Sequence, residues 1–469
     1  MENRKRSRLL WAGICAYILL VSSSIALAAE TVEIKNNSND TVFKLVFHGT
    51  ADTNIEVAWD MNAEQKEALV RAAQYWADRV KPEGAPAEPV VIYVTTMEDN
   101  NASSAARTFA IGPNIYATAA ELTLNNNRVL VENGWTDRHS TITIGSGTYN
   151  LDPNNSQISI GASLESTMIH EMGHTLGISS LAANYPDITS TWDGLLTNDI
   201  DGDVVIREGT LAHSIYNDGG STRQYIPMDS ASPQVRSHFG LINGLMTHRH
   251  FRNYSGFMEV EMAALNDLGY GIELRDFFGR SVYTSGNSII NGTGFFAYDG
   301  GNYQAGQSNT SSFGLGLHVF GGDNTIYQNA DIMADGYAGG GIRSDGVGNT
   351  IIINPDITVQ ANGEYGTGVI VAYGHSGVLV NRGVIRAAGP EGDAVRFDIG
   401  RNQLGVYGRP DQASYFKTSL SATSEEYQLA EKLLDGALVK TFDLTGSLEA
   451  SRNALYISPN AHVETVNIM

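Results

Sequence analysis

Residues 170 to 177 read HEMGHTLG, and this octet carries the clearest chemical signal in the chain. His170 and His174 are four positions apart, so on a helix they project from the same face and can bind one zinc ion. Glu171 lies beside the first histidine, where it can take a proton from a zinc-bound water as general base. Gly177 lets the chain leave the helix sharply, because glycine enters the left-handed conformation at no steric cost.

A helix must position this octet, and the flanking residues predict one. Ser163 fits as its N-cap, and apolar side chains recur at the spacing of a buried helix face. These apolar positions are Leu164, Met168, Met172 and Leu176. The alternative is a surface helix that carries two histidines by chance, since the pattern H-E-x-x-H also occurs in unrelated chains. The burial pattern and the trailing glycine favour the metal site.

A catalytic zinc site needs a third protein ligand. The octet, together with the sequence LMT at residues 245 to 247, resembles the metzincin family of zinc metalloproteases. Metzincins carry their third ligand three residues after the glycine, where this chain has Ser180, a poor zinc ligand. Leishmanolysin-like metzincins instead place a long insertion before the third histidine, followed shortly by a Met-turn beneath the zinc. The resemblance implies that residues 178 to 237 are that insertion, that His238 is the third ligand and that Met246 lies in the Met-turn.

Other interpretations of these residues stay open. His238 could be a packing or hydrogen-bonded histidine, and Met246 an ordinary core residue. His213, inside the insertion, is a second candidate for the third ligand. His248 stands where some metzincins carry a transition-state-stabilising tyrosine, but a loop histidine is the simpler interpretation. Two further histidines, expected at the surface, are His139 and His250.

Residues 199 to 203 read DIDGD, and alternate carboxylates of this kind can converge on Ca²⁺. The segment departs from the EF-hand pattern, because Val204 stands where a glycine is needed and Thr210 where the bidentate glutamate is needed. We therefore expect an acidic turn, with Ca²⁺ as the weaker alternative.

The first residues predict export. Four basic residues up to Arg8 precede an apolar run from residue 9 to 27, and Ala26-Leu27-Ala28 offers a cleavage site, so residues 1–29 are a predicted signal peptide. A retained membrane anchor is the alternative, although a run of three serines interrupts the apolar segment. The single cysteine, Cys15, lies within this peptide. The mature chain then has no thiolate, so histidines and carboxylates must hold any metal.

Charge and hydropathy restrict the partners. The formal net charge of -21 argues against nucleic acid and anionic lipid and favours a well-solvated secreted protein. No later apolar run is long enough for a spanning helix, so we expect no stable membrane insertion of the mature chain.

Residues 30–275 combine helical and strand patterns, which predicts an α+β catalytic domain. Asn62 fits as the cap of an amphipathic helix that ends before Pro82. Strands are predicted at residues 90–94, 141–144 and 157–160. A last helix is expected from Ser255 to Leu268, closed by Gly269.

Residues 276–469 are rich in glycine and asparagine and repeat. Units begin at residues 316, 341, 368 and 394, which gives spacings of 25, 27 and 26 residues. Short β runs at this period predict a right-handed parallel β-helix with one coil per repeat. A helical insertion is expected from Ser424 to Leu434. The pattern still runs at residue 469 without a cap, so we expect a truncated passenger there.

A second resemblance covers this part. Residues 246 to 283 are similar to secreted metalloprotease domains at the head of bacterial autotransporters, and the repeats are similar to autotransporter passenger β-helices. The resemblance implies secretion or display on the outer membrane of a Gram-negative bacterium. Because the repeats are not followed here by the C-terminal translocator barrel that the resemblance implies, we expect a passenger fragment or a shortened relative that is exported some other way.

These observations predict a zinc-dependent endopeptidase, with a metzincin-like α+β head followed by a β-helical stalk. Its zinc would be held by His170, His174 and His238, with Glu171 as general base. Partners would be protein or peptide substrates, including a host or surface protein, bound extended along an edge strand. One alternative is a surface adhesin with an inactive protease-like head and a binding β-helix. Another is a zinc hydrolase that acts on a non-peptide substrate.

Overall fold

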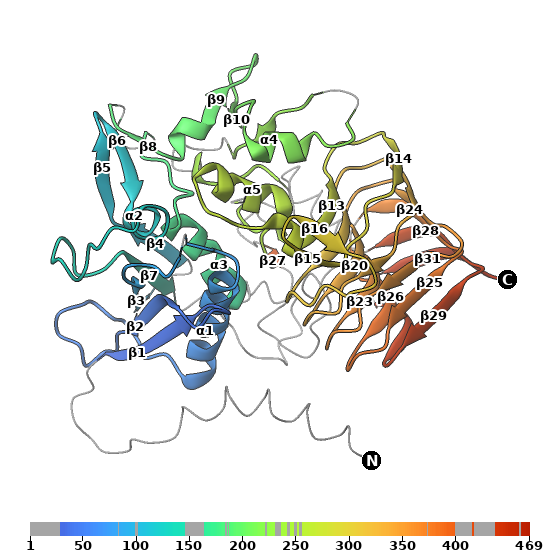
Figure 1. The fold of residues 1–469 in the computed structure, drawn as a ribbon, viewed down its shortest axis with the longest axis horizontal. Coiled ribbons are helices and arrows are strands. Elements are labelled where there is room, and N and C mark those ends of the chain that lie inside the picture. Colours follow the sequence, from blue (N-terminus) through green and yellow to red (C-terminus); the bar gives the residue numbers. More distant parts are fainter. Residues whose placement is uncertain are drawn as a thin grey trace.

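The computed structural model of the chain shows an α/β head beside a stack of short strands (Figure 1). It describes residues 29–82, 84–98, 102–145, 164–182, 185, 187–220, 223–229, 236–241, 244–247, 251–252, 256–372, 374–398, 415–416, 437–458 and 461–469. Several predicted features lie outside these residues, namely the signal peptide up to residue 28, the cap Ser163, the strand at 157–160, His248, His250 and the helix at 424–434.

The head is built on a five-stranded sheet of order β1-β2-β3-β7-β4. Strands β2, β3 and β7 are parallel, whereas the flanking strands β1 and β4 run antiparallel to their neighbours. The apolar run at residues 90–94 and the alternating Thr-Ile-Thr-Ile at residues 141–144 were both predicted as strands, and both predictions are confirmed. The strands are β1 (Glu30–Lys35), β2 (Thr41–Phe47), β3 (Val90–Met97), β7 (Ser140–Gly145) and β4 (Ala102–Ala106).

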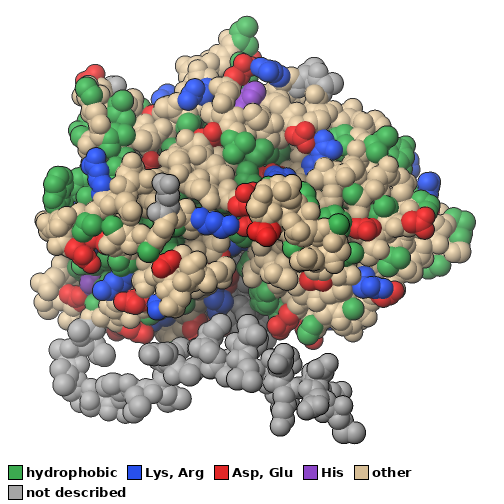
Figure 2. All heavy atoms as spheres, viewed as in Figure 1, with side chains coloured by type: hydrophobic (Ala, Val, Ile, Leu, Met, Phe, Trp, Pro, Cys, Tyr) green, Lys and Arg blue, Asp and Glu red, His purple; other side chains and the backbone are tan. Residues whose placement is uncertain are grey.

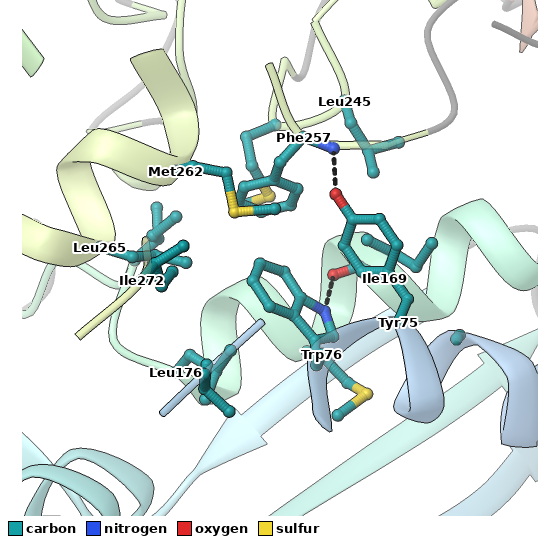
Figure 3. Packing of buried hydrophobic residues seen from close by; sticks show 14 of the residues in the cluster. Tyr75, Trp76, Ile169, Leu176, Leu245, Phe257, Met262, Leu265 and Ile272 are labelled. Carbon is teal, nitrogen blue, oxygen red and sulfur yellow. Dashed lines mark hydrogen bonds between the residues drawn. The ribbon is translucent and has the colours of Figure 1, made fainter. Parts of the chain in front are cut away.

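Two helices pack together beside this sheet, and both were predicted. Helix α1 (Ala63–Ala77) begins at the predicted cap Asn62, which forms a capping box with Gln65. Helix α3 (Leu164–Thr175) carries the first six residues of the octet 170–177, and the four predicted apolar positions, Leu176 just after the helix included, are buried. Trp76 fixes the contact, because its indole N–H donates to the Ile169 carbonyl oxygen at 3.1 Å (Figure 3).

The remaining elements of the head are short. A helix was expected from Ser255, but α5 (Glu259–Asp267) begins four residues later, because Met258 has extended backbone and acts as the N-cap. Gly269 ends this helix with φ 103°, as predicted. The others are β5 (Thr108–Gly112), β6 (Ile115–Thr118), α2 (Ala119–Asn126), β8 (Thr189–Ser190), η3 (Asp193–Leu195), β9 (Leu196–Asn198), β10 (Val204–Ile206), α4 (Leu211–Tyr216), β11 (Ile226–Pro227), β12 (Phe251–Arg252) and η5 (Leu274–Asp276).

His139, expected at the surface, is fully buried. Its Nδ1 accepts the backbone N–H of Val91 at 3.0 Å, and its Nε2 lies 2.9 Å from the Thr123 hydroxyl and 3.2 Å from a Glu88 oxygen. Burial lowers the pKa of this imidazole. The expectation was wrong because His139 directly precedes β7, an interior strand of the sheet. The periodicity of the sequence does not reveal that the residue before this strand is buried.

The stalk consists of three parallel sheets, and each predicted repeat contributes a strand to them. This arrangement is compatible with a parallel β-helix. The first sheet contains β13 (Phe278–Val282), β17 (Leu315–Val319), β20 (Gly340–Ser344), β23 (Thr367–Val371), β26 (Asp393–Phe397) and β30 (Asn453–Ile457). The second contains β14 (Ser288–Asn291), β18 (Thr325–Gln328), β21 (Thr350–Ile353), β24 (His375–Asn381), β28 (Leu438–Leu444) and β31 (His462–Ile468). The third contains β19 (Ile332–Met333), β22 (Thr358–Gln360), β25 (Val384–Ala387) and β29 (Ser447–Ala450).

Two small pairings complete the strands. A hairpin of β15 (Ala297–Asp299) and β16 (Asn302–Gln304) projects from the first coils. Strand β12 of the head pairs antiparallel with β27 (Tyr415–Phe416), so the backbone of a late segment reaches the head.

A buried asparagine ladder explains the repeated Asn-Thr-Ile sequences. The Asn324 side chain accepts the backbone N–H of Asn287 at 2.9 Å, and the Asn349 side chain accepts that of Asn324 at 3.0 Å. Each asparagine therefore satisfies a turn amide of the preceding coil, which would otherwise be a buried donor without a partner.

Head and stalk share one hydrophobic core. Leu315 and Ala338 of the first coils belong to the same buried cluster as the core of the head. Arg79 at the end of α1 is 2% exposed, and its guanidinium lies 3.6 Å from the Tyr75 ring centroid and 4.3 Å from that of Phe277. It also donates to the carbonyl oxygen of Ser312 at 3.0 Å. The boundary expected at residues 275 and 276 falls in η5, inside this contact.

Among the described residues, no helix is long and apolar enough to cross a bilayer. On the face shown in Figure 2, acidic and basic side chains are interspersed. This face therefore presents no extended field of one sign that could steer a charged partner.

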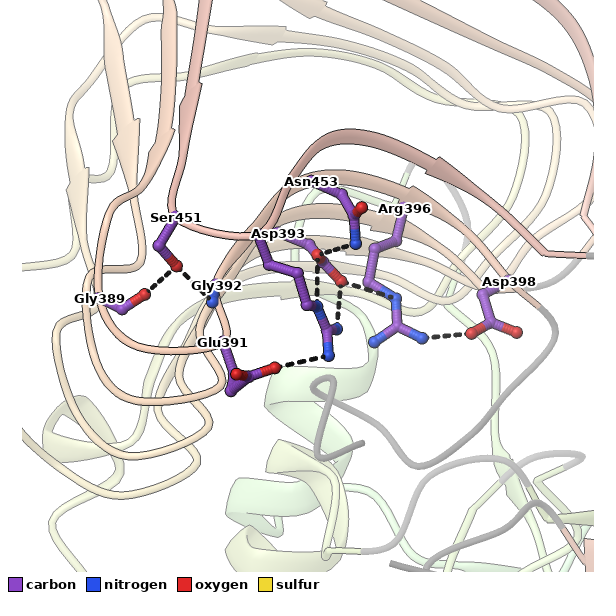
Figure 4. A network of polar contacts seen from close by, with 9 residues as sticks. Gly389, Glu391, Gly392, Asp393, Arg396, Asp398, Ser451 and Asn453 are labelled. Atoms are coloured by element: carbon purple, nitrogen blue, oxygen red, sulfur yellow. Dashed lines mark hydrogen bonds and ion pairs between the residues drawn. The ribbon is translucent and has the colours of Figure 1, made fainter. Parts of the chain in front are cut away.

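Buried charges in the stalk form paired networks. The Asp393 carboxylate accepts hydrogen bonds from Arg452 at 2.8 Å and from the Asn453 amide at 2.8 Å, while Arg396 contacts Asp398 (Figure 4). Two repeats earlier along the sheet, Asp345 pairs with Arg343 and His318, and all three are almost fully buried. Pairing of this kind is needed because a buried charge without a partner is strongly destabilising.

The His318–Asp345 pair predicts how stability depends on pH. Burial lowers the pKa of His318 below its ordinary 6.5, while Arg343 and His318 outweigh burial and lower the pKa of Asp345 to about 2. Below pH 6.5 the unfolded chain binds a proton at this histidine that the folded chain does not, so stability falls as the pH falls. Urea midpoints at pH 7.5 and 5.5 should therefore differ less in His318→Gln than in the wild type. His462→Gln, at an exposed histidine, is the control and should keep the pH dependence of the wild type. An unchanged pH dependence in His318→Gln would contradict the prediction.

Candidate metal centre

Three histidines from two separate segments converge in the head. His170 and His174 lie on α3, and His238 lies on the segment 236–241, which follows the insertion. Nε2 of His170 lies 3.1 Å from Nε2 of His174 and 3.3 Å from Nε2 of His238. One ligand atom from each of the three histidines lies within 4.8 Å of the others. The structure thus brings together the three residues that the sequence predicted as ligands.

Backbone carbonyl groups determine which nitrogen of each α3 histidine carries hydrogen. Nδ1 of His170 lies 2.8 Å from the carbonyl oxygen of Leu245, and Nδ1 of His174 lies 2.6 Å from that of Ile178. A carbonyl oxygen only accepts, so each Nδ1 is the donor. In the neutral imidazole, Nε2 then presents its lone pair to the other histidines, as a metal ligand must.

The spacing of these nitrogens fits zinc. Two nitrogens bound to one tetrahedral zinc at about 2.0–2.1 Å lie roughly 3.3 Å apart. The Nε2 distances of 3.1 and 3.3 Å agree with that separation. Lone pairs that face each other so closely repel unless a cation or a proton lies between them. The donor set and its spacing therefore suit a metal ion.

The segment 244–247 lies against α3 close to the histidines. Gly173 makes this approach feasible, because a Cβ there would lie 3.0 Å from Met246 Sδ and 2.6 Å from Phe257 Cζ. The Met246 amide donates to Glu261 Oε1 at 2.8 Å, and the Glu261 side chain is fully buried. Met246 is therefore packed beneath the helix that carries the ligands, and its neighbour Leu245 orients His170.

Glu171 follows His170 on α3 and is 6% exposed. Its carboxyl group is therefore largely shielded from bulk water.

Ser180 does not belong to the cluster. Its hydroxyl donates to Asp193 Oδ1, and its backbone N–H donates to Ser237 Oγ at 2.8 Å. The position at which metzincins carry a ligand is thus occupied by a residue that contacts the neighbour of His238.

The alternative candidates also lie elsewhere. His213 is buried on α4, beside Asn217 and 6.1 Å from the Tyr225 ring, and burial lowers its pKa. In the acidic turn, Asp199 Oδ1 accepts the backbone N–H groups of Asp201 and Asp203 at 3.0 and 2.9 Å. Among the described residues, the three-histidine cluster is the one convergent group of metal-ligand side chains.

Several supporting residues were not predicted. Glu261 accepts the backbone N–H of Met246, Asp193 accepts the hydroxyl of Ser180, and Ser104 Oγ of the edge strand β4 lies 3.0 Å from Thr175 Oγ1 at the end of α3. Their partners are backbone groups or hydroxyls far away in sequence, so no local pattern points to them.

No family model, curated protein or solved structure matches this chain. The case for a function rests on the residues and on their geometry.

Gly173 provides a test of the packing beneath α3. Gly173→Ala should lower the free energy of unfolding by about 1–2 kcal/mol, because the added methyl group overlaps Phe257 and Met246, while the better helix propensity of alanine offsets part of the cost. Chemical denaturation measures the change. Gly292→Ala is the control, since its Cβ meets nothing within 4 Å. Equal stability of both variants would contradict the tight contact.

Proposed function

We propose that this protein is a zinc-dependent endopeptidase whose metzincin-like head is carried on a right-handed β-helical stalk. The observation that supports the proposal best is the convergence of His170, His174 and His238, with Nε2 atoms 3.1 and 3.3 Å apart. The Nδ1–H donors of two of these rings to carbonyl groups support it further, because they place the lone pair of each neutral ring on Nε2, the atom that would bind a metal.

The three histidines would hold the ion, and zinc bound there would polarise a substrate carbonyl and acidify water. Glu171 accepts a proton on its carboxylate and later donates it to the nitrogen of the departing amine. A chain of contacts from Leu245 through Met246 to Glu261 keeps the first histidine in place during these transfers.

The substrate would be an extended segment of protein or peptide. Strand β4 lies at an edge of the head sheet, so its outer backbone groups can pair with such a segment by β-augmentation. Contacts of Ser104 with Thr175 and Ser140, at 3.0 and 3.2 Å, connect this edge to the end of α3. We further propose that the protein is exported by its N-terminal signal peptide and acts outside the cell or on the cell surface, where host or surface proteins would be its targets.

Zinc content and proteolysis of casein test the proposal on purified protein. The wild type should hold about one zinc per chain and cleave casein, and a chelator should abolish cleavage until zinc is restored. His238→Ala should lose zinc, whereas Glu171→Gln should keep zinc and lose about 10²–10⁴-fold in kcat. His213→Ala serves as the matched control, since this buried histidine of the insertion lies outside the cluster and should leave the zinc content unchanged.

Three results would contradict the proposal or part of it. A wild type without zinc and without cleavage favours the adhesin with an inactive head. A zinc protein that leaves peptides intact favours a hydrolase of another substrate class. Full zinc content in His238→Ala removes that residue from the ligand set.

A further inference from the structure

Two consecutive residues of the insertion, Trp192 and Asp193, contact the segment that directly follows α3 and the segment that carries His238. His174 and His238 are separated by the whole insertion, so a precise site needs a device that holds the second segment against the first. The contacts of this pair are specific, and each can be removed separately.

Asp193 fixes the segment that leaves α3. Its Oδ2 accepts the backbone N–H groups of Leu181, Ala182 and Ser190 at 3.0, 3.2 and 2.7 Å, and its Oδ1 accepts the hydroxyl of Ser180. This segment begins beside Ile178, whose carbonyl oxygen orients His174. One carboxylate thereby fixes the path of the chain directly after the second ligand.

Trp192 fixes the segment that carries His238. Its indole N–H donates to the carbonyl oxygen of Arg236 at 2.8 Å, and its ring lies 5.7 Å from that of Phe239. Trp192 and Phe239 are both fully buried. The two contacts flank His238 on either side in the sequence.

A third contact joins the two segments directly. The backbone N–H of Ser180 donates to Ser237 Oγ at 2.8 Å, and both residues are less than one-tenth exposed. Ser180, which stands at the usual metzincin ligand position, therefore holds Ser237, the neighbour of His238 in the sequence.

We infer that Trp192 and Asp193 are positioning residues that hold His238 in the metal site. They act through Arg236, Phe239 and Ser180 and do not touch the metal. The inference rests on the proposed zinc site. It adds the contacts that hold His238 in the site, where it takes the place of a ligand at position 180. Loss of supporting contacts around a metal typically weakens binding by about 10–100-fold.

Metal affinity and the visible spectrum of the cobalt-substituted protein test this role. We expect Asp193→Asn to weaken zinc binding about 10–100-fold and to shift the cobalt spectrum towards that of His238→Ala. Trp192→Phe, which keeps a smaller aromatic ring and loses the N–H donor, and Ser237→Ala should each give a smaller change in the same direction. Asp187→Asn is the matched control, since this exposed carboxylate lies six residues before Asp193 in the same insertion.

The outcomes separate this inference from the proposed function. Zinc affinity and a cobalt spectrum equal to those of the wild type in folded Asp193→Asn, Trp192→Phe and Ser237→Ala would overturn the positioning role and leave the zinc site intact. A wild type that binds neither metal would overturn both. If Asp193→Asn does not fold, judged by circular dichroism, Trp192→Phe and Ser237→Ala decide, because Ser237→Ala removes only a side-chain hydrogen bond and Trp192→Phe keeps an aromatic ring at its position.

Discussion

The hydrogen bond from His170 Nδ1 to the Leu245 carbonyl oxygen is the interaction on which the candidate site depends most directly. It sets the tautomer of the first histidine and couples α3 to the segment 244–247. That segment is held in turn by the buried carboxylate of Glu261, which accepts the amides of Met246 and Met258 at 2.8 Å each. Ligand, turn and α5 therefore form one connected unit, in which a carboxylate buried on α5 acts on an imidazole that it does not touch.

Close packing makes this unit rigid. The absence of a side chain at Gly173 lets Phe257 and Met246 approach the helix backbone between the two ligands. The Phe257 amide donates to the Tyr75 hydroxyl at 2.9 Å, and the adjacent Trp76 donates to α3 (Figure 3). Helix α1 thus contacts both Phe257 and α3. The aromatic residues Tyr75 and Trp76 near its C-terminal end make these two contacts.

The sequence predicted what depends on local pattern and missed what depends on distant partners. The octet predicted α3 and two ligands by spacing alone, and repeats near 26 residues predicted parallel strands whose phase the structure confirms. His238 was reached only through a family resemblance, because no periodicity connects it with α3. The contacts of Asp193 and Glu261 with backbone amides could not be predicted, since any residue supplies an amide. His139 was assigned to the surface for the same reason, as its partners Val91, Thr123 and Glu88 come from distant parts of the sequence.

The charged residue Arg79 is buried at the junction of head and stalk. Its side chain lies between Tyr75 of the head and Phe277 at the start of the stalk and bonds to Ser312, with no bulk water around it. A head cut off at residue 276 would expose this cation and the aromatic rings around it. The smallest self-contained form of the head therefore includes the first strands of the stalk. Any recombination that exchanges such heads between stalks, in nature or by design, has to place its crossover beyond them.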